Sequence, residues 1–256
     1  MNPESAAASG AAAYFPLLRP EFTDDLAAGE HRLRSIMQGD VRTVAPGRPL
    51  VVAEQPGNFV FRLRSGWCAR ARHMRDGRSQ IFSLHLPGDL IGTRGLFAQL
   101  EMDEVYALGP VELEAVAYAR LLGEVKADRT LTLRILSQVI EDDRRLHNWM
   151  VAVGRGTAEE RLALLLLDLR GRLVLGKMLD ADADRFALPM TQMQIGDLLG
   201  LTAVHVNRML RRFREQKIAT IARGAAILHD IPQLHRIARP MLDAYEKSRP
   251  EFGAPL

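Results

Sequence analysis

The residues most able to do chemistry in this chain are four arginines that crowd one short segment. The segment TAVHVNRMLRRFR, residues 202–214, holds Arg208, Arg211, Arg212 and Arg214. Arginine donates several hydrogen bonds from a planar, permanently charged group, which suits it to bind phosphate and the edge of guanine. The chemistry expected here is recognition of a polyanion; the alternative is a solvated helix face.

A helical arrangement separates this segment into two faces. At about 100° per residue the apolar side chains share one face, and they are Val206, Met209, Leu210 and Phe213. The opposite face carries Val204, Asn207, Arg208 and Arg211, and His205 and Arg212 lie along one flank. We therefore expect one side of the helix to pack on a scaffold while the other side binds the partner.

Positive charge is concentrated around this helix. The whole chain has a formal net charge of only +3, yet residues 203–223 contain six Lys or Arg side chains against one acid, Glu215. A local basic patch on a nearly neutral protein indicates a polyanionic partner, such as nucleic acid, at that one place.

The elements around residues 202–214 are those of a winged helix-turn-helix. A capping-box pattern at Thr191 opens the short helix QMQIGDLLG, Gly200 supplies a tight turn, and Gly196 lies where two helices would touch. Two short apolar pieces around Arg223-Gly224 predict a hairpin, the wing, and Asp230 caps a last helix. In this motif the second helix enters the major groove of double-stranded DNA. The candidate DNA-binding residues are Thr202, Val204, His205, Asn207, Arg208, Arg211 and Arg212.

The first half of the chain has the pattern of antiparallel strands. Between about residues 40 and 119, Phe59, Phe61 and Leu63 point to one side of a strand, and Asp76-Gly77 marks a hairpin. Strands at this regular spacing predict a barrel or roll. The expected fold class is α+β, with an N-terminal antiparallel β-roll (a double-stranded β-helix), a long dimerisation helix and a C-terminal winged helix-turn-helix.

The long helix is predicted from about residue 127 to residue 153. GRG at 154–156 ends it and is the expected domain boundary, after which Thr157 and Glu160 form another capping-box pattern. The stripe of the long helix is Leu136, Val139, Asp143, Leu146, Met150 and Val153. So narrow a stripe, with one polar residue, favours pairing with a second copy of the same helix; the alternative is a spacer helix within one chain.

The single cysteine, Cys68, limits the possible cofactors. One cysteine excludes an intramolecular disulfide and any iron–sulfur cluster or thiolate zinc site built within one chain. We interpret Cys68 as a small strand residue beside Trp67, with a redox-sensing thiol as the alternative. The seven histidines form no HxH or HExxH pair, and no pattern indicates an enzyme.

Neither the N-terminal residues nor the apolar runs of the chain indicate export or a membrane. No apolar run approaches the roughly 18 residues that a membrane span needs. The N-terminal MNPESAAASGAAAYFP lacks the positive charge of a signal peptide. We therefore expect a cytoplasmic protein with no membrane partner and a flexible first segment.

The motifs together resemble one known family, the Crp/Fnr transcription regulators. GRGTAEERLALLLLDL, LPMTQMQIGDLLGLTAVHVNRMLRRF and the hairpin after them follow that family's order and spacing, and DGRSQIFSLHLPGDLIGTRGLF resembles its cyclic-nucleotide-type β-roll. The resemblance implies a homodimer whose sensor roll controls how two recognition helices meet a palindromic operator, with RNA polymerase as a partner. The implied domains are an N-terminal segment (1–30), a cyclic-nucleotide-binding-like sensor roll (31–126), the dimerisation helix (127–154), the DNA-binding domain (155–240) and a C-terminal tail (241–256).

The resemblance also assigns the base-contacting positions, which are Val204, Asn207 and Arg208. Arg208 keeps the arginine that reaches guanine in the family, whereas Val204 replaces a common glutamate and Ala203 replaces an arginine of some members. An apolar contact between Val204 and a thymine methyl group is expected in place of the glutamate contact.

The same resemblance bears on the cyclic-nucleotide site. Relatives that bind the nucleotide hold its ribose with a glutamate and its phosphate with an arginine followed by a small residue. Counted from Gly92, the ribose position here is Thr93 and the phosphate positions are Asp103 and Glu104. Two carboxylates would repel a phosphate, and the direction of Arg94 does not follow from the sequence. We expect no use of cAMP or cGMP, and the effector stays open.

Two other function classes match parts of the pattern. A signalling module would bind a ligand in the β-roll without acting on DNA, but the basic recognition face argues against it. A cupin-like metalloenzyme would need His and carboxylate ligands on facing strands, for which His73 and His85 are too isolated. The expected function is thus a sequence-specific transcription regulator.

Overall fold

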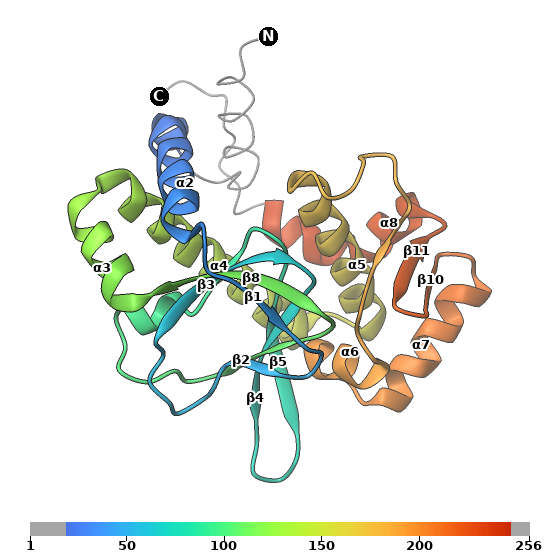
Figure 1. The fold of residues 1–256 in the computed structure, drawn as a ribbon. Coiled ribbons are helices and arrows are strands. Elements are labelled where there is room, and N and C mark those ends of the chain that lie inside the picture. The colour runs from blue at the N-terminus through green and yellow to red at the C-terminus, as the bar shows by residue number, and fades with distance from the viewer. Residues whose placement is uncertain (1–18, 247–256) are drawn as a thin grey trace. The chain divides into compact units, whose positions relative to one another are not determined.

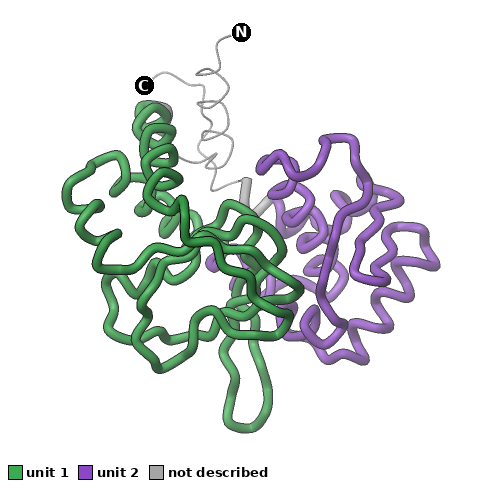
Figure 2. Tube along the Cα trace, in the orientation of Figure 1, with its two compact units in different colours: residues 1–145 green, residues 146–256 purple. Residues whose placement is uncertain are grey.

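A computed structural model describes residues 19–246 of the chain. These residues form two compact units, which divide after Arg145 (Figure 2). The division falls inside the long helix α4 (Arg129–Arg155). The domain boundary predicted from the sequence lies further on, at GRG (154–156), and the functional boundaries stay a prediction.

Unit 1 is built around a roll of two antiparallel sheets (Figure 1). One sheet has the strand order β1-β8-β3-β6 and the other β2-β7-β4-β5, and every pairing is antiparallel. The strands are β1 (Val41–Val44), β2 (Pro49–Val51), β3 (Phe59–Ser65), β4 (Cys68–His73), β5 (Ser79–His85), β6 (Leu90–Ile91), β7 (Glu104–Ala107) and β8 (Val111–Ala117). The predicted antiparallel roll is confirmed.

Strands β4 and β5 form the hairpin that Asp76-Gly77 predicts. The amide of Gly77 donates to the carbonyl of Met74 at 3.0 Å, and the amide of Met74 donates to the carbonyl of Arg78 at 2.8 Å. Gly77 has a φ of +85°, a left-handed conformation that glycine adopts without steric cost. The turn therefore depends on the residue that marks it in the sequence.

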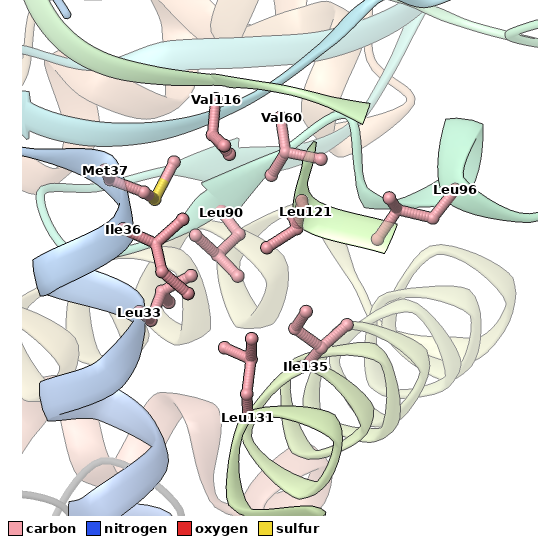
Figure 3. Close-up of a cluster of buried hydrophobic side chains, with 10 residues drawn as sticks. All are labelled: Leu33, Ile36, Met37, Val60, Leu90, Leu96, Val116, Leu121, Leu131 and Ile135. Carbon is pink, nitrogen blue, oxygen red and sulfur yellow. The ribbon is translucent and has the colours of Figure 1, made fainter. Parts of the chain in front are cut away.

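Strand β3 is buried on both of its faces. Phe61 and Leu63 lie in the core formed by both sheets, with Phe59 packed against it, as predicted. Val60 lies in a second core, where helices cover the β1-β8-β3-β6 sheet (Figure 3). This second core consists of Leu33, Ile36, Met37, Val60, Leu90, Leu96, Val116, Leu121, Leu131 and Ile135. The helices thus bury the face of β3 that simple alternation would leave in water.

Helix α2 (Thr23–Met37) contributes to this cover, and it is not among the elements predicted from the sequence. It follows the short 3-10 helix η1 (Pro20–Phe22). Its apolar positions are interrupted by Gly29, where an added Cβ would lie 2.2 Å from the carbonyl oxygen of Thr130 on α4. A glycine at the point of contact leaves a gap in the apolar repeat from which a helix is predicted in a sequence. Of the segment 1–30, residues 1–18 lie outside the described residues and residues 23–30 are helical.

The predicted long helix is present, but a break precedes it. Helix α3 (Tyr118–Ala127) ends before Asp128, and α4 begins at Arg129. The Asp128 carboxylate accepts from the amides of Thr130 at 2.9 Å and Leu131 at 3.1 Å, so it caps the first turn of α4. The helix ends at Arg155, inside the GRG segment that was expected to stop it.

Unit 2 is a winged helix-turn-helix. Its helices are α5 (Ala158–Leu175), α6 (Gln192–Leu199), α7 (Ala203–Glu215) and α8 (Ile231–Glu246). The small sheet has the order β10-β11-β9, with β9 (Arg185–Ala187), β10 (Ala219–Ala222) and β11 (Ala225–Leu228). Both predicted capping boxes are present, at Thr157 and at Thr191, and the predicted motif is confirmed.

Helix α8 closes the described part of unit 2. Asp230 accepts from the amide of Gln233 at 2.7 Å and so caps α8, as the sequence predicts. Of the predicted C-terminal tail, residues 247–256 lie outside the described residues, and residues 241–246 complete this helix.

Candidate nucleic-acid interface

Two glycines set the angle between α6 and α7. Gly200 ends α6 in a left-handed conformation with φ +66°. Gly196 lies so close to the turn that an added Cβ would lie 2.5 Å from the carbonyl oxygen of Leu201, and its own carbonyl accepts from the Leu201 amide at 2.9 Å. A larger residue at Gly196 would force the two helices apart. The two glycines therefore fix the orientation of α7 relative to α6.

Helix α7 divides into the two faces that its sequence predicts. Val206, Met209 and Phe213 are buried, and Leu210 is half-buried. Val204 is 82% exposed, and Asn207, Arg208, Arg211 and Arg212 are exposed as well. His205 is half-buried along the flank. The apolar side holds α7 in unit 2, and the polar side faces outward.

The predicted DNA-binding residue Thr202 has a structural role in α7. Its hydroxyl accepts from the amide of His205 at 3.3 Å and caps the helix. An N-cap bond of this kind satisfies one of the amides that a helix leaves free at its start. The N-terminal end of α7, from which base edges are read in this motif, is thus fixed locally.

The outward arginines of α7 differ in their partners. Arg211 donates to Glu215 at 2.8 Å, a contact that raises the pKa of its guanidinium, and Arg212 pairs with Glu159 at the start of α5. Within residues 19–246, the side chain of Arg208 has neither a hydrogen bond nor an ion pair. Arg208 is therefore available to a ligand without breaking an internal contact.

The wing adds a further cation beyond the predicted site. Arg223 and Gly224 both have positive φ values, +52° and +73°, as a two-residue hairpin turn between β10 and β11 requires. Arg223 is exposed at this tip. The third strand, β9, is too short to show a period in the sequence, and it pairs with β11. The sequence predicts the hairpin, but Arg223 is not among the predicted site residues.

The predicted stripe of α4 is mostly exposed in the single chain. Leu136, Val139, Leu146 and Met150 are exposed apolar residues, and Asp143 is exposed among them. Two more exposed apolar residues, Ile140 and Val151, widen the stripe. Val153 differs, because it is half-buried near the helix-turn-helix turn, where a Cβ added at Gly200 would lie 3.2 Å from it.

In the β-roll, both carboxylates at the expected phosphate positions have basic neighbours: Asp103 pairs with arginines, and Glu104 lies 3.5 Å from Nε2 of His73. Thr93 is buried in the 3-10 turn η2 (Thr93–Leu96). Arg72 donates to Asp103 at 3.0 and 2.6 Å, and Arg94 lies 3.5 Å from the other oxygen of the same carboxylate. Asp103 is only 7% exposed. The direction of Arg94, which the sequence does not give, is thus toward this carboxylate.

The single cysteine lies in the core of the β-roll. Cys68 is fully buried in the core formed by both sheets, and burial, together with the charge of Asp89, raises the pKa of its thiol to about 12. A thiol with so high a pKa stays protonated and unreactive. Residues 19–246 bring no three His, Cys, Asp or Glu side chains together as a metal site, and none of their helices is long and apolar enough to cross a membrane.

Comparison with known proteins gives matches to both units. The chain matches the family "Crp-like helix-turn-helix domain" over residues 160–237 and the family "Cyclic nucleotide-binding domain" over residues 41–128. It is 32% identical over 181 residues to the transcriptional activator protein FnrA of Stutzerimonas stutzeri, covering 67% of this chain and 72% of that protein. It is 27% identical over 209 residues to the transcriptional regulatory protein btr of Bordetella pertussis, covering 80% and 84%.

A solved structure of similar fold supports the same comparison. The structure of FixK2 from Bradyrhizobium japonicum matches with a TM-score of 0.69 and 26% identity, over 77% of this chain and 96% of that one. The match extends over both of its parts, the β-roll and the helix-turn-helix.

Proposed function

The chain belongs to the Crp/Fnr family of transcription regulators, and on that premise we propose that it acts as a homodimer which binds a palindromic operator through α7 and does not use cAMP or cGMP. Its relatives are regulators of transcription and not enzymes. A Crp-like helix-turn-helix binds DNA, so the proposal concerns how this chain binds it and what controls it.

The observation that carries the proposal is the outward face of α7. Arg208 has no partner within the described residues and lies beside Asn207 and the exposed Val204 on the face opposite the buried stripe. Arginine donates two hydrogen bonds to O6 and N7 of guanine, and a valine suits a thymine methyl group. Arg208 and Val204 are therefore the proposed base contacts, while Arg211, Arg212 and Arg223 would reach phosphates.

The proposed domain roles follow the residue ranges expected from the sequence. Residues 31–126 form the sensor, residues 127–154 form the dimerisation helix, and residues 155–240 form the DNA-binding domain. The exposed apolar residues of α4 support pairing of two copies, because a face with this many large apolar residues is unfavourable in water. A dimer presents two recognition helices to two half-sites of a palindrome.

The proposal that cyclic nucleotides are not used is supported by the arrangement at Asp103. Its buried carboxylate already accepts from Arg72 and lies within ion-pair distance of Arg94. A phosphate placed there would have to compete with this carboxylate for the two guanidinium groups, in a partly dehydrated site where the existing ion pairs are stronger than in water. The two arginines have an internal anion as their partner, and the controlling signal, if it is a ligand, is of another kind.

The remaining partners follow from this activity. Regulators of this family act on DNA together with RNA polymerase, which we propose as a second macromolecular partner. The cytoplasm is the proposed location because it is where bacterial DNA is transcribed. With one cysteine the chain does not supply the thiolates of an iron–sulfur cluster.

Selection of operator sequences tests the proposed function. The purified full chain is incubated with fragmented genomic DNA, and the retained fragments are sequenced and then used in mobility-shift titrations. We expect a palindromic consensus and binding at least about a thousandfold tighter than to random DNA, as is usual for specific regulators. Retention of fragments without any shared sequence would contradict the proposal.

A further inference from the structure

The side chain of Asn207 on α7 is hydrogen-bonded to that of Gln192, a residue that is not among the predicted site residues. Its Nδ2 donates to Oε1 of Gln192 at 3.0 Å. Gln192 is the first residue of α6, 15 positions earlier in the chain, and both side chains are exposed. The bond therefore joins the two helices of the motif on their outer surface, next to Arg208.

The backbone around Gln192 is fixed by the start of α6. Thr191 accepts from the amide of Gln194 at 3.2 Å, and the side chain of Gln194 accepts from the amide of Thr191 at 2.9 Å. This reciprocal capping box engages Gln194 and orders the first turn. Gln192 projects from that ordered turn, so its amide is a defined partner for Asn207.

The hydrogen bond to Gln192 determines which donor and acceptor groups of the Asn207 side chain remain available to a base. An asparagine amide has one acceptor oxygen and two N–H donors. With one N–H donated to Gln192, the remaining groups are Oδ1 and the second N–H. Adenine shows the complementary pair in the major groove, an N6 donor beside an N7 acceptor, and asparagine binds it through both.

We infer that Gln192 is a positioning residue which orients the Asn207 amide and thereby makes it select adenine in the operator. The inference rests on the proposed function, because it assumes that α7 lies in the major groove. It goes beyond that function by assigning a base preference to Asn207 and a role to Gln192, which does not itself need to touch DNA.

Substitutions at Gln192 distinguish the possible orientations of the pair. Glutamate only accepts, so Gln192→Glu keeps the Asn207 N–H directed toward α6. Lysine only donates, so Gln192→Lys turns Oδ1 of Asn207 toward α6 and leaves N–H donors outward. Such donors match the two acceptors of guanine, N7 and O6. Gln192→Ala removes the partner and leaves the amide free to turn.

The experiment measures base preference and not affinity alone. The operator position opposite Asn207 is the one whose preference is lost in Asn207→Ala, and its four base pairs are compared in competition titrations for each variant. We expect the wild type and Gln192→Glu to prefer adenine and Gln192→Ala to lose roughly tenfold of that discrimination, within the range of one bidentate contact. Gln192→Lys is expected to favour guanine.

A matched control separates orientation from simple loss of contact. Met193 is the next residue on α6 and is exposed, so Met193→Ala should leave the preference at this position unchanged. Gln192→Glu adds a negative charge near phosphates and is expected to lower affinity for all sequences alike. Preference is a ratio between sequences and is insensitive to that uniform loss.

The outcomes distinguish this inference from the proposed function. If wild type selects an operator and Arg208→Ala relaxes one base pair, but Gln192→Ala leaves the preference of Asn207 intact, the positioning role is wrong while the function stands. An unchanged adenine preference in Gln192→Lys would contradict it as well. If wild type shows no sequence preference at all, the proposed function has failed.

Discussion

At the scale of single residues, Arg208 and Arg212 differ in what binding DNA would cost them. Arg208 has no internal partner within the described residues, whereas Arg212 must leave Glu159 before it binds a phosphate. Exposed ion pairs contribute little, about 0–1 kcal/mol, so this exchange is easy. If α7 binds DNA as proposed, we therefore expect the two side chains to differ because of where they lie on α7, and not because the ion pair holds Arg212 back.

Substituting these two arginines separates base contacts from phosphate contacts. Arg208→Ala is expected to weaken the best operator by about 1–3 kcal/mol and to relax preference at one base pair, as for a bidentate guanine contact. Arg212→Ala is expected to weaken all sequences alike and to reduce the salt slope by about 1. Binding titrations at several salt concentrations measure both effects. Identical profiles for the two variants would show that the face of α7 presented to the bases is misassigned.

The faces of α7 follow from its sequence, but its side-chain partners do not. The apolar period of 3.6 residues places Val206 and Phe213 inward, and the structure has them buried. The bond from Asn207 to Gln192 and the direction of Arg94 toward Asp103 depend on which elements meet in space. No local pattern encodes such contacts between residues far apart in the chain.

At the scale of elements, local chemistry predicts the turns and caps better than it predicts helices that cross closely. The predicted caps and turns are all present, because each depends on residues that lie within a few positions of one another in the sequence. They are the two capping boxes and the turns at Asp76-Gly77 and Arg223-Gly224. Helix α2 is not predicted, because Gly29 interrupts its apolar repeat. In the structure this glycine permits close contact with α4. Strand β9 is not predicted, because its three residues are too few to show an alternating pattern.

The β-roll gives a prediction about ligand binding. Arg72 and Arg94 already share the buried Asp103 carboxylate, and Glu104 follows it on β7. We expect calorimetric titration of the full chain with cAMP or cGMP to show no binding in the low micromolar range, and operator affinity to be unchanged by either nucleotide. Specific operator binding by the same sample is the control for a folded protein. Micromolar binding together with enhanced operator affinity would overturn this prediction.

At the scale of the whole molecule, the stripe of α4 is a run of large apolar residues that lies exposed in the described part of a single chain. Leu146 is 40% exposed and Met150 is 64% exposed, one turn apart on the same helix face. Pairing with a second copy of α4 would remove this apolar surface from water, at roughly 25 cal/mol per Å². Two DNA-binding units held together would also occupy two half-sites at once, which raises affinity without a new DNA contact.

Replacing Leu146 and Met150 together by glutamate tests this arrangement. Both side chains are exposed in the single chain, so the double variant should remain folded, with an unfolding temperature measured by circular dichroism close to that of the wild type. In a dimer the two carboxylates would be buried without partners, which costs far more than the apolar contact contributes. Sedimentation equilibrium is therefore expected to show a dimeric wild type and a monomeric double variant. Operator binding, measured by titration, should weaken at least about a hundredfold through loss of the second half-site.

Leu175→Glu, at a similarly exposed apolar residue that ends α5, is the matched control and should remain a dimer. A wild type that sediments as a monomer at micromolar concentration would refute pairing through α4, because the apolar stripe would then be stable in water on its own.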